Sequence, residues 1–363
     1  MRFIDLQTQY QTYKTAIDTA MQEVLDSALF VNGPQVAQLE EALARFVGVA
    51  HGVGFSSGTD SLLAVLMAWG IGPGDEVITT PFTFIATAEV IALLGAKPVF
   101  VDLDPDTLNL DVHRLEAAIT PRSRAILPVS LYGQCADFDA INAIADRHGL
   151  LCLEDGCQSF GALYRGRRSC SLSKAGATSF FPAKPLGCYG DGGMAFTDDA
   201  QLAERLRVIR EHGQVARYQH ALLGINGRLD TLQAAVLLAK LPHFEAEIAA
   251  RQRVAAYYRS HLQGRVQLPV VAADCLSVYA QFTVRIPQRD AVQRHLTQMG
   301  IPTAIHYPAP LHRQGVFASL GYPEEAFPVA NQAAREVLSL PMHPFLSTTE
   351  QDRIIAALLQ ALA

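Results

Sequence analysis

Short apolar runs alternate with amphipathic stretches through the first half of the chain. The apolar runs have the length and composition of buried strands, and helical spacing separates the earlier ones. The seven runs are Val53–Phe55, Glu76–Thr79, Pro98–Val101, Ala125–Ser130, Leu150–Leu153, Ala177–Phe180 and Met194–Thr197. The helical stretches are Ser61–Trp69, Thr87–Leu94, Asp111–Ile119 and Asp137–Arg147. This alternation predicts an α/β fold in which a mostly parallel seven-stranded sheet lies between helices, with ligands bound beyond the carboxyl ends of the strands.

Two amphipathic helices are expected before the first strand, at about 11–27 and 36–46. The break between them, Asn32-Gly33-Pro34, has two open interpretations. It either reaches the mouth of the binding site or is a simple turn between helices.

The last third of the chain changes its pattern. A helix at 229–241 precedes a long amphipathic helix that Pro242 opens and that runs to about Leu262. Strands are expected at 279–286 and 302–306, and helices at 291–299 and 348–362. We therefore expect a large domain over residues 1–240 and a smaller C-terminal α+β domain over residues 241–363.

Composition narrows the function classes. The 363 residues are 50% hydrophobic and 18% charged, with a net charge of −6, which is typical of a compact protein with a large core. No segment concentrates Lys and Arg, so we expect no nucleic-acid partner. The apolar runs are too short to span a membrane, and the first residues lack a secretory signal, which favours a cytoplasmic protein. The six cysteines form no CxxC pair and no cluster with histidines, so we expect neither a disulfide nor a metal site.

One lysine has an unusual setting. Lys184 lies between Pro182 and Pro185 in the stretch ATSFFPAKPLGCYGDGG, after an apolar run and before a glycine cluster. The prolines fix the backbone, and no acidic residue in the five preceding positions can pair with the amine. Most lysines are solvated surface charges. This setting instead favours an amine that attacks a carbonyl to form a Schiff base.

Two strand ends carry candidate binding groups. Ser56-Ser57-Gly58-Thr59-Asp60-Ser61 opens a helix and predicts a phosphate cradle of backbone N–H groups, although an ordinary N-cap explains the same residues. Asp155 closes a buried strand, where a carboxylate is costly unless it is paired. It either pairs with a cationic ligand or caps a helix.

These motifs, in this order, resemble the DegT–StrS type aminotransferases, sugar-nucleotide enzymes that use pyridoxal 5′-phosphate (PLP) on the fold-type-I scaffold. The resemblance runs from Phe3-Ile4-Asp5-Leu6 to Ser339-Leu340-Pro341-Met342-His343-Pro344, nearly the whole chain. It implies that Lys184 holds PLP and shuttles a proton, and that Asp155 pairs with the pyridinium nitrogen. The cofactor-binding residues that it implies are Gly58, Thr59, Phe84, Asp155, Gln158, Ser179, Lys184 and Asn226. The substrate-binding residues are Arg228, His306 and Tyr307.

The resemblance also implies partners. We expect a homodimer with shared active sites, in which Asn226 reaches the partner's cofactor phosphate and Arg228 the partner's active-site entrance. Taken alone, these residues need no binding role. An Asn-Gly turn before a helix is an ordinary structural feature, and so is a His-Tyr pair such as that at 306–307. The sequence departs from the family at Gly156-Cys157, where two alanines are usual, and at Asp191, where many relatives have Glu.

The expected reaction moves an amino group from L-glutamate to a keto-sugar nucleotide and releases 2-oxoglutarate. The stretches 128–145, 179–193 and 228–235 resemble a subgroup that aminates C3 of UDP-2-acetamido-2-deoxy-3-oxo-glucuronate for bacterial surface polysaccharide, such as the LPS O-antigen. A 4-aminotransferase for 4-keto-6-deoxy sugars and a non-catalytic PLP-binding regulator remain alternatives. A related sugar dehydratase is disfavoured because Lys184 is intact, and a nucleotide-binding dehydrogenase because no G-x-G-x-x-G joins a strand to a helix.

Overall fold

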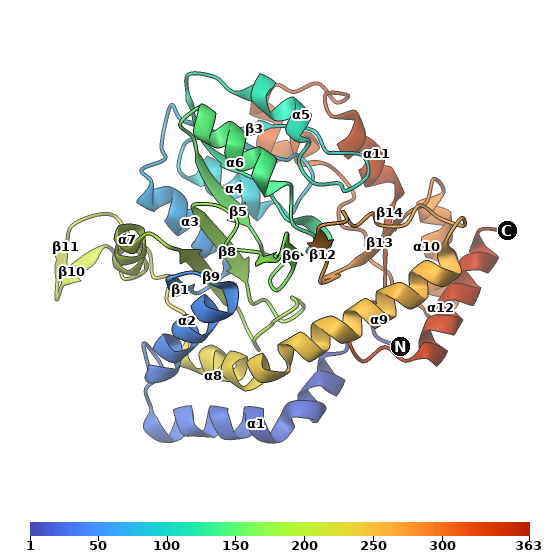
Figure 1. Cartoon of the computed structure of the whole chain (residues 1–363), viewed down its shortest axis with the longest axis horizontal. Coiled ribbons are helices and arrows are strands. Elements are labelled where there is room, and N and C mark those ends of the chain that lie inside the picture. Colours follow the sequence, from blue (N-terminus) through green and yellow to red (C-terminus); the bar gives the residue numbers. More distant parts are fainter.

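A seven-stranded sheet forms the centre of the molecule (Figure 1). The computed structural model describes residues 1–363. The strand order is β1 (His51–Phe55), β9 (Gly193–Thr197), β8 (Ala175–Ser179), β5 (Leu151–Asp155), β4 (Ser123–Leu127), β2 (Glu76–Thr79) and β3 (Lys97–Phe100). Only β9 runs antiparallel to its neighbours, and all the other pairs are parallel. The predicted mostly parallel sheet is confirmed.

Helices cover both faces of this sheet because successive strand residues point to opposite sides. Val77 and Leu153 pack with α3 (Gly58–Ala68), α4 (Ala86–Leu93) and α7 (Ala200–Arg210). Ile78 and Cys152 pack on the other face with α2 (Pro34–Val47), α6 (Phe138–Arg147) and α8 (Thr231–Lys240). Helix α7 was not predicted, although Asp199 caps it and Leu202, Leu206 and Ile209 recur at helical spacing on its buried side.

Long helices run along the lower edge of the molecule in Figure 1. The first helix, α1 (Leu6–Ser27), lies against α8 and begins five residues before the predicted start. The short 3₁₀ turn η1 (Glu116–Ala118) follows α5 (Val112–Leu115), where one longer helix was expected. After α8, the 3₁₀ turn η3 (Leu241–His243) leads into α9 (Phe244–Leu262), which crosses to the C-terminal part of the chain.

The C-terminal part is built on a two-stranded sheet. Strands β13 (Phe282–Arg285) and β14 (Val337–Leu340) pair antiparallel. They share a buried core with α9, α10 (Arg289–Gln298) and α12 (Thr348–Ala361).

The strand expected at 302–306 is wrong. Only Ala304 forms a bridge, to Ser339, because Pro302 has no N–H to donate and the chain then turns toward the binding site.

The segment before β14 packs elsewhere. It contains η4 (Leu311–Arg313), η5 (Gly315–Leu320) and α11 (Pro328–Glu336), none of which was predicted. Phe317 and Phe327 both contact Phe100 at the β3 edge of the central sheet, with ring centroids 6.0 and 6.1 Å away. The division of the chain into two domains at residue 240 stays a prediction.

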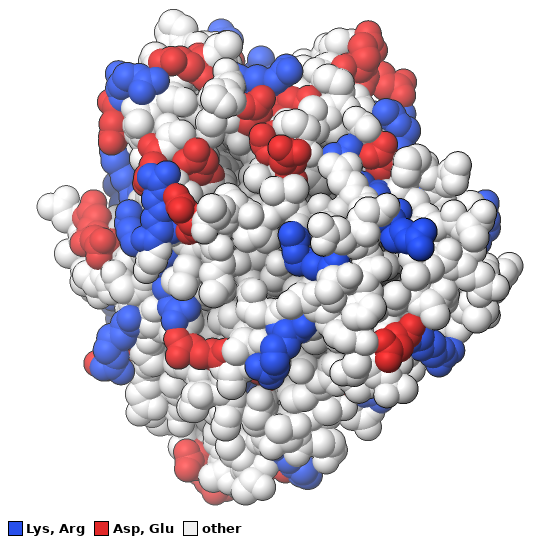
Figure 2. Space-filling view, turned by 45° about the vertical axis from the view of Figure 1, so that its right-hand side comes forward, with Lys and Arg blue, Asp and Glu red and all other residues white.

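Several short elements complete the fold. They are β6 (Leu163–Tyr164), β7 (Arg167–Arg168) and β12 (Cys275–Leu276), which form one small sheet, the turn η2 (Leu131–Gly133), and the hairpin β10 (Gln214–Ala216) and β11 (Gln219–His220). The hairpin projects from the body of the molecule in Figure 1. Basic and acidic side chains are interspersed on the face that Figure 2 shows. None of the helices has the length and hydropathy that crossing a bilayer requires.

Candidate functional site

Lys184 lies on the loop that joins β8 to β9, beyond the end of β8. The loop is closed by backbone hydrogen bonds from Phe180 N–H to Gly192 O (2.7 Å) and from Cys188 N–H to Phe180 O (2.8 Å). Lys184 N–H donates to Phe181 O at 2.9 Å. The Lys184 side chain is partly exposed, and its Nζ makes no hydrogen bond and no ion pair in the chain. The loop therefore presents an amine that is bound to no other group of the chain.

Asp155 ends β5 beside this loop and is 5% exposed. Its Oδ2 accepts a 2.7 Å hydrogen bond from the Thr87 hydroxyl, and its Oδ1 accepts from Cys157 N–H at 3.1 Å. No helix follows Asp155, so the helix-cap alternative is wrong. The buried carboxylate has two neutral donors and no cationic partner in the chain, which leaves it able to pair with a positively charged ligand.

Glu154, the preceding residue, points to the opposite face of the sheet and is fully buried. Its Oε1 accepts from the Ser169 hydroxyl at 2.6 Å and from the Ser130 hydroxyl at 3.1 Å, and its Oε2 accepts from Cys170 N–H at 2.7 Å. Burial raises the pKa of Glu154 to about 7, and the charge of Asp155 adds to that rise. The hydrogen bonds oppose this effect without cancelling it.

The phosphate cradle was predicted at the start of α3. Ser57 is its N-cap, and its hydroxyl accepts from Asp60 N–H at 3.0 Å, so the capping alternative is confirmed for that residue. The N–H groups of Gly58 and Thr59 make no hydrogen bond in the chain. A Cβ added at Gly58 would lie 2.7 Å from Ser179 Cβ, so the cradle and the end of β8 are in direct contact. Free N–H groups at a helix start form a site for an anion.

Cys157 lies at the same junction. A Cβ at Gly58 would lie 2.9 Å from its Sγ. Burial, followed by the charge of Asp155, raises the pKa of the Cys157 thiol well above its ordinary value, while the charge of Lys184 acts in the opposite direction. The thiol is therefore protonated at neutral pH and fills space between the cradle and Asp155.

Four residues from distant parts of the chain close the site. Gln158 Oε1 accepts from Tyr132 N–H at 3.0 Å, and its Nε2 donates to the Tyr307 hydroxyl at 3.2 Å. The Tyr132 hydroxyl donates to the His306 carbonyl. Burial, then the charge of Lys184, lowers the pKa of His306, so the imidazole is neutral at neutral pH. Burial, then the charge of Asp155, raises the pKa of Tyr307. The sequence-predicted residues Lys184, Asp155, Gln158, His306 and Tyr307 are thus brought together.

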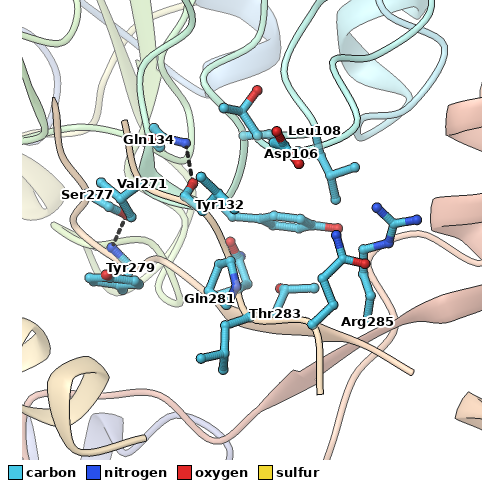
Figure 3. Close-up of a pocket in the computed structure, with 16 residues that line it drawn as sticks. Asp106, Leu108, Tyr132, Gln134, Val271, Ser277, Tyr279, Gln281, Thr283 and Arg285 are labelled. Atoms are coloured by element: carbon cyan, nitrogen blue, oxygen red, sulfur yellow. Dashed lines mark hydrogen bonds between the residues drawn. The ribbon is translucent and has the colours of Figure 1, made fainter. Parts of the chain in front are cut away.

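Tyr132 was missed by the sequence analysis. It also lines a small cavity, shown in Figure 3, where its ring points toward Arg285. The cavity lies between η2 and β13, and its lining includes neither Lys184 nor Asp155. A tyrosine inside an apolar run looks like a core residue, and nothing local links Tyr132 to His306, which follows much later in the chain.

Phe84 is not a core residue. Its side chain is 55% exposed, whereas Phe82, two positions earlier, is 1% exposed. Its ring centroid lies 6.4 Å from that of Tyr307. An exposed aromatic face at the edge of the site can stack on a planar ligand.

Asn226 and Arg228 lie on a loop beside the start of α3, because Gly227 O accepts from Ser56 N–H at 2.8 Å. Asn226 is exposed, and its side chain makes no hydrogen bond. Arg228 Nη1 pairs with Glu211 Oε2 at 2.9 Å, and Glu211 Oε1 accepts from Asn32 Nδ2 at 2.9 Å. No hydrogen bond joins either predicted residue to Lys184 or Asp155 of the same chain.

Known proteins are similar to this chain over nearly its whole length. The chain matches the model of the DegT/DnrJ/EryC1/StrS aminotransferase family over residues 11–359. It is 56% identical over 360 residues to a UDP-2-acetamido-2-deoxy-3-oxo-D-glucuronate aminotransferase of Pseudomonas aeruginosa, with 99% of each chain covered. It is 48% identical over 356 residues to a pleiotropic regulatory protein of Geobacillus stearothermophilus, with 97% of this chain and 96% of that one covered. Its structure is similar to DesV of Streptomyces venezuelae, with a TM-score of 0.98 at 44% identity, covering 99% of this chain and 98% of that one.

Proposed function

Since this chain belongs to the DegT/DnrJ/EryC1/StrS aminotransferase family, we propose that it transfers the amino group of L-glutamate to C3 of UDP-2-acetamido-2-deoxy-3-oxo-D-glucuronate. The protein is an aminotransferase, and its cofactor is PLP. The substrate proposal is supported by the 56% identity to the Pseudomonas enzyme of that name over nearly the full length. The aminated product would serve bacterial surface-polysaccharide synthesis, such as that of the LPS O-antigen.

The residues at the site fit PLP. The unpaired Nζ of Lys184 suits an aldehyde, and the buried carboxylate of Asp155 suits a protonated ring nitrogen. The free N–H groups of Gly58 and Thr59, with the Ser179 hydroxyl beside them, suit a phosphate. Phe84 offers an exposed aromatic face to a planar ring. The observation that carries the proposal is that two groups lie at neighbouring strand ends. One is an amine without a hydrogen-bond partner, and the other is a buried carboxylate without a cationic partner.

When bound, PLP supplies an electron sink for the bond that breaks at the donor's α-carbon. The protein supplies positions and protons. Lys184 Nζ would hold the cofactor at its aldehyde carbon and would move the proton of the donor's α-carbon, and Asp155 would keep the ring nitrogen protonated. Thr87 and Cys157 N–H orient the Asp155 carboxylate for that task. Gln158, already bonded to Tyr132 and Tyr307, would donate its remaining amide N–H to the ring hydroxyl oxygen.

The substrate face is assigned to His306, Tyr307 and Arg228. His306 is a neutral imidazole next to the charge of Lys184, which suits hydrogen bonding to an uncharged sugar hydroxyl or carbonyl. The Tyr307 hydroxyl lies beside Gln158. Arg228 offers a guanidinium that can bind a carboxylate in a two-point geometry, which a glucuronate presents and a 6-deoxy sugar does not.

We also propose a homodimer that shares its active sites. Asn226 is exposed and unbonded, and Arg228 is bonded only to Glu211, so both can be presented to a partner subunit. Large apolar side chains are exposed just after α1, on the β10–β11 hairpin and just after it. They are Leu29 (52%), Phe30 (45%), Val31 (53%), Val215 (59%), Tyr218 (79%) and Leu223 (89%). Apolar exposure of this extent is typical of a surface that another protein covers.

A regulator without catalytic activity is the second candidate, because the Geobacillus relative at 48% identity is named a pleiotropic regulatory protein. The two candidates differ in one measurement. An aminotransferase converts its bound cofactor to the aminated form when L-glutamate alone is added, which changes the cofactor's absorption, and 2-oxoglutarate is released. A regulator leaves the absorption unchanged.

Borohydride reduction followed by peptide mass spectrometry tests the central assignment. The reduced cofactor is expected on the peptide that contains Lys184, and K184A is expected to lose it. K174M changes an exposed lysine near the start of β8 and serves as the matched control, with unchanged labelling. Label on any other side chain, or colourless protein after PLP is supplied, contradicts the assignment. Parallel assays with a 3-oxo-glucuronate and a 4-keto-6-deoxy sugar nucleotide then test the substrate.

A further inference from the structure

A second lysine is buried next to the Lys184 loop. Lys240, the last residue of α8, is 3% exposed, and its Nζ lies 5.2 Å from the centre of the Tyr189 ring. No carboxylate lies within ion-pair distance of it. Burial lowers the pKa of Lys240 to about 8, although the charge of Glu247 opposes that effect. A buried lysine without a carboxylate partner is costly, so the fold keeps an unfavourable side chain at this position.

The single hydrogen bond that Lys240 makes goes to the loop. Its Nζ donates to the carbonyl oxygen of Gly187, three residues after Lys184. No backbone N–H in the chain donates to this carbonyl, which is buried. Gly187 has no space to adjust, because a Cβ at that position would lie 2.4 Å from Pro182 O and 2.8 Å from Phe181 O. The two sides of the loop are in direct contact at Gly187. A displacement of the Gly187 carbonyl therefore also moves the segment from Pro182 to Pro185, which carries the Lys184 amine.

Helix α8 holds the same side of the loop at a second point. Gln233 Oε1 accepts from Tyr189 N–H at 2.8 Å. Gln233 and Lys240 are seven residues apart, two turns of helix, so they lie on one face of α8. Both contacts lie after Lys184, while the side before it continues directly from β8.

We propose that Lys240 is a positioning residue for the reaction, which fixes the Lys184 amine by holding the Gly187 carbonyl to α8. The inference rests on the proposed role of Lys184. Lys240 itself does not touch the cofactor site, because its amine is buried and engaged with Gly187. Removing the donor leaves a buried carbonyl without a partner and lets the second half of the loop move. An amine displaced by about 1 Å reacts far more slowly with an aldehyde held in a rigid cradle.

The test compares K240M, an unbranched side chain one atom shorter that removes the donor, with K240R, which restores a donor. Thermal unfolding, the dissociation constant of PLP and the separate values of kcat and KM are measured for each. K240M is expected to weaken PLP binding and to lower kcat by about ten- to a hundredfold, with the KM for the sugar nucleotide unchanged. K240R is expected to recover most of both losses. K174M, which alters an exposed lysine, is expected to match the wild type.

A PLP dissociation constant and kcat within about twofold of the wild type in folded K240M overturn the proposal. So does a K240R variant that recovers thermal stability but neither of the two cofactor-dependent values. If K240M does not fold, K240Q takes its place, because its shorter amide reaches Gly187 less well, and the same two values decide. Borohydride labelling of each variant separates the two hypotheses. Label away from Lys184 in the wild type contradicts the proposed function, whereas label at Lys184 with unchanged K240M values contradicts only the role of Lys240.

Discussion

The hydroxyl of Thr87 donates a 2.7 Å hydrogen bond to the carboxylate of Asp155, from helix α4 to the end of strand β5. The hydroxyl of Thr83, four residues earlier and before the start of α4, lies 3.2 Å from that of Thr87. Asp155 has no cationic partner in the chain, so this bond and the one from Cys157 N–H set the direction of its oxygens. In the proposed role of Asp155, its carboxylate pairs with the ring nitrogen of PLP, and Thr87 would fix the direction of that carboxylate.

Replacing Thr87 with valine keeps its shape and removes that donor. A hydrogen bond to a charged group contributes about 1.5–3 kcal/mol, so T87V is expected to weaken PLP binding or lower kcat by about ten- to a hundredfold. Spectroscopic titration of the apoprotein with PLP and steady-state kinetics measure the two effects. T83V is the matched control, because it removes a hydroxyl that bonds Thr87 but not Asp155. Equal losses in both variants would show that the bond to Asp155 is not the cause.

Gly58 is expected to tolerate no side chain. A Cβ there would lie 2.7 Å from Ser179 Cβ and 2.9 Å from Cys157 Sγ, so G58A must displace the end of β8 or the Cys157 thiol. The displacement disturbs the free N–H groups at the helix start, and PLP affinity is expected to fall by about tenfold or more. G72A is the control, since a Cβ at Gly72 meets nothing within 4 Å. PLP binding by G58A that matches G72A would remove the cradle from the cofactor site.

Shared active sites predict complementation between two inactive variants. K184A lacks the amine, and N226D places a negative charge where the partner's cofactor phosphate is expected. A mixed dimer keeps one site with both native residues, so random exchange of equal amounts is expected to restore about a quarter of the wild-type activity. Activity of the mixture is measured after subunit exchange and compared with each variant alone. If exchange is confirmed by mass but no activity returns, Asn226 and Lys184 do not come from different subunits.

The sequence predicted the central sheet because its signal is local. Each strand is a short apolar run between helical stretches. A strand that is buried on both faces is apolar along its whole length, so the run itself indicates the strand. The C-terminal part was harder. Its strand at 302–306 is reduced to one bridge at Ala304, and the true partner of β13 is the run 337–340. An apolar run near a proline does not tell which of two candidate segments pairs with a given strand.

The residues of the candidate site also fall into two groups, those with a local sequence signal and those that depend on contacts with distant residues. Lys184 was predicted from its immediate neighbours, a pair of prolines, and Asp155 was noticed at a strand end and given its role by the family resemblance. Thr87 and Tyr132 were missed because they act through bonds to residues far along the chain, Asp155 and the His306 carbonyl. Thr87 stood within a predicted helix, where a threonine needs no explanation. Asn226 and Arg228 stay predictions, since a single chain does not place them at a second subunit's site.

Glu154 predicts a pH dependence of stability that the cofactor site does not explain. Burial raises the pKa of this carboxyl to about 7 from 4.5 in the unfolded chain. The folded state therefore holds a proton between pH 4.5 and 7 that the unfolded state has released, and the free energy of unfolding falls as pH rises through this window. A difference of this size is worth about 3 kcal/mol, fully present below pH 4.5 and lost above pH 7. The hydroxyls of Ser169 and Ser130 can rotate to accept from the protonated form.

E154Q removes the titration and keeps the shape, because the amide oxygen can accept from Cys170 N–H while its NH₂ donates to the two hydroxyls. Urea unfolding of the apoprotein at pH 5 and pH 8 is the measurement. E154Q is expected to match the wild type at pH 5 and to exceed its free energy of unfolding by up to about 3 kcal/mol at pH 8. E204Q changes an exposed carboxyl on α7 and should leave the difference between the two pH values unaltered. The contrary result is a free energy of unfolding of the wild type, relative to that of E154Q, that does not fall between pH 5 and pH 8. That result would mean that the hydrogen bonds to Ser169, Ser130 and Cys170 compensate the burial of a charged Glu154 completely.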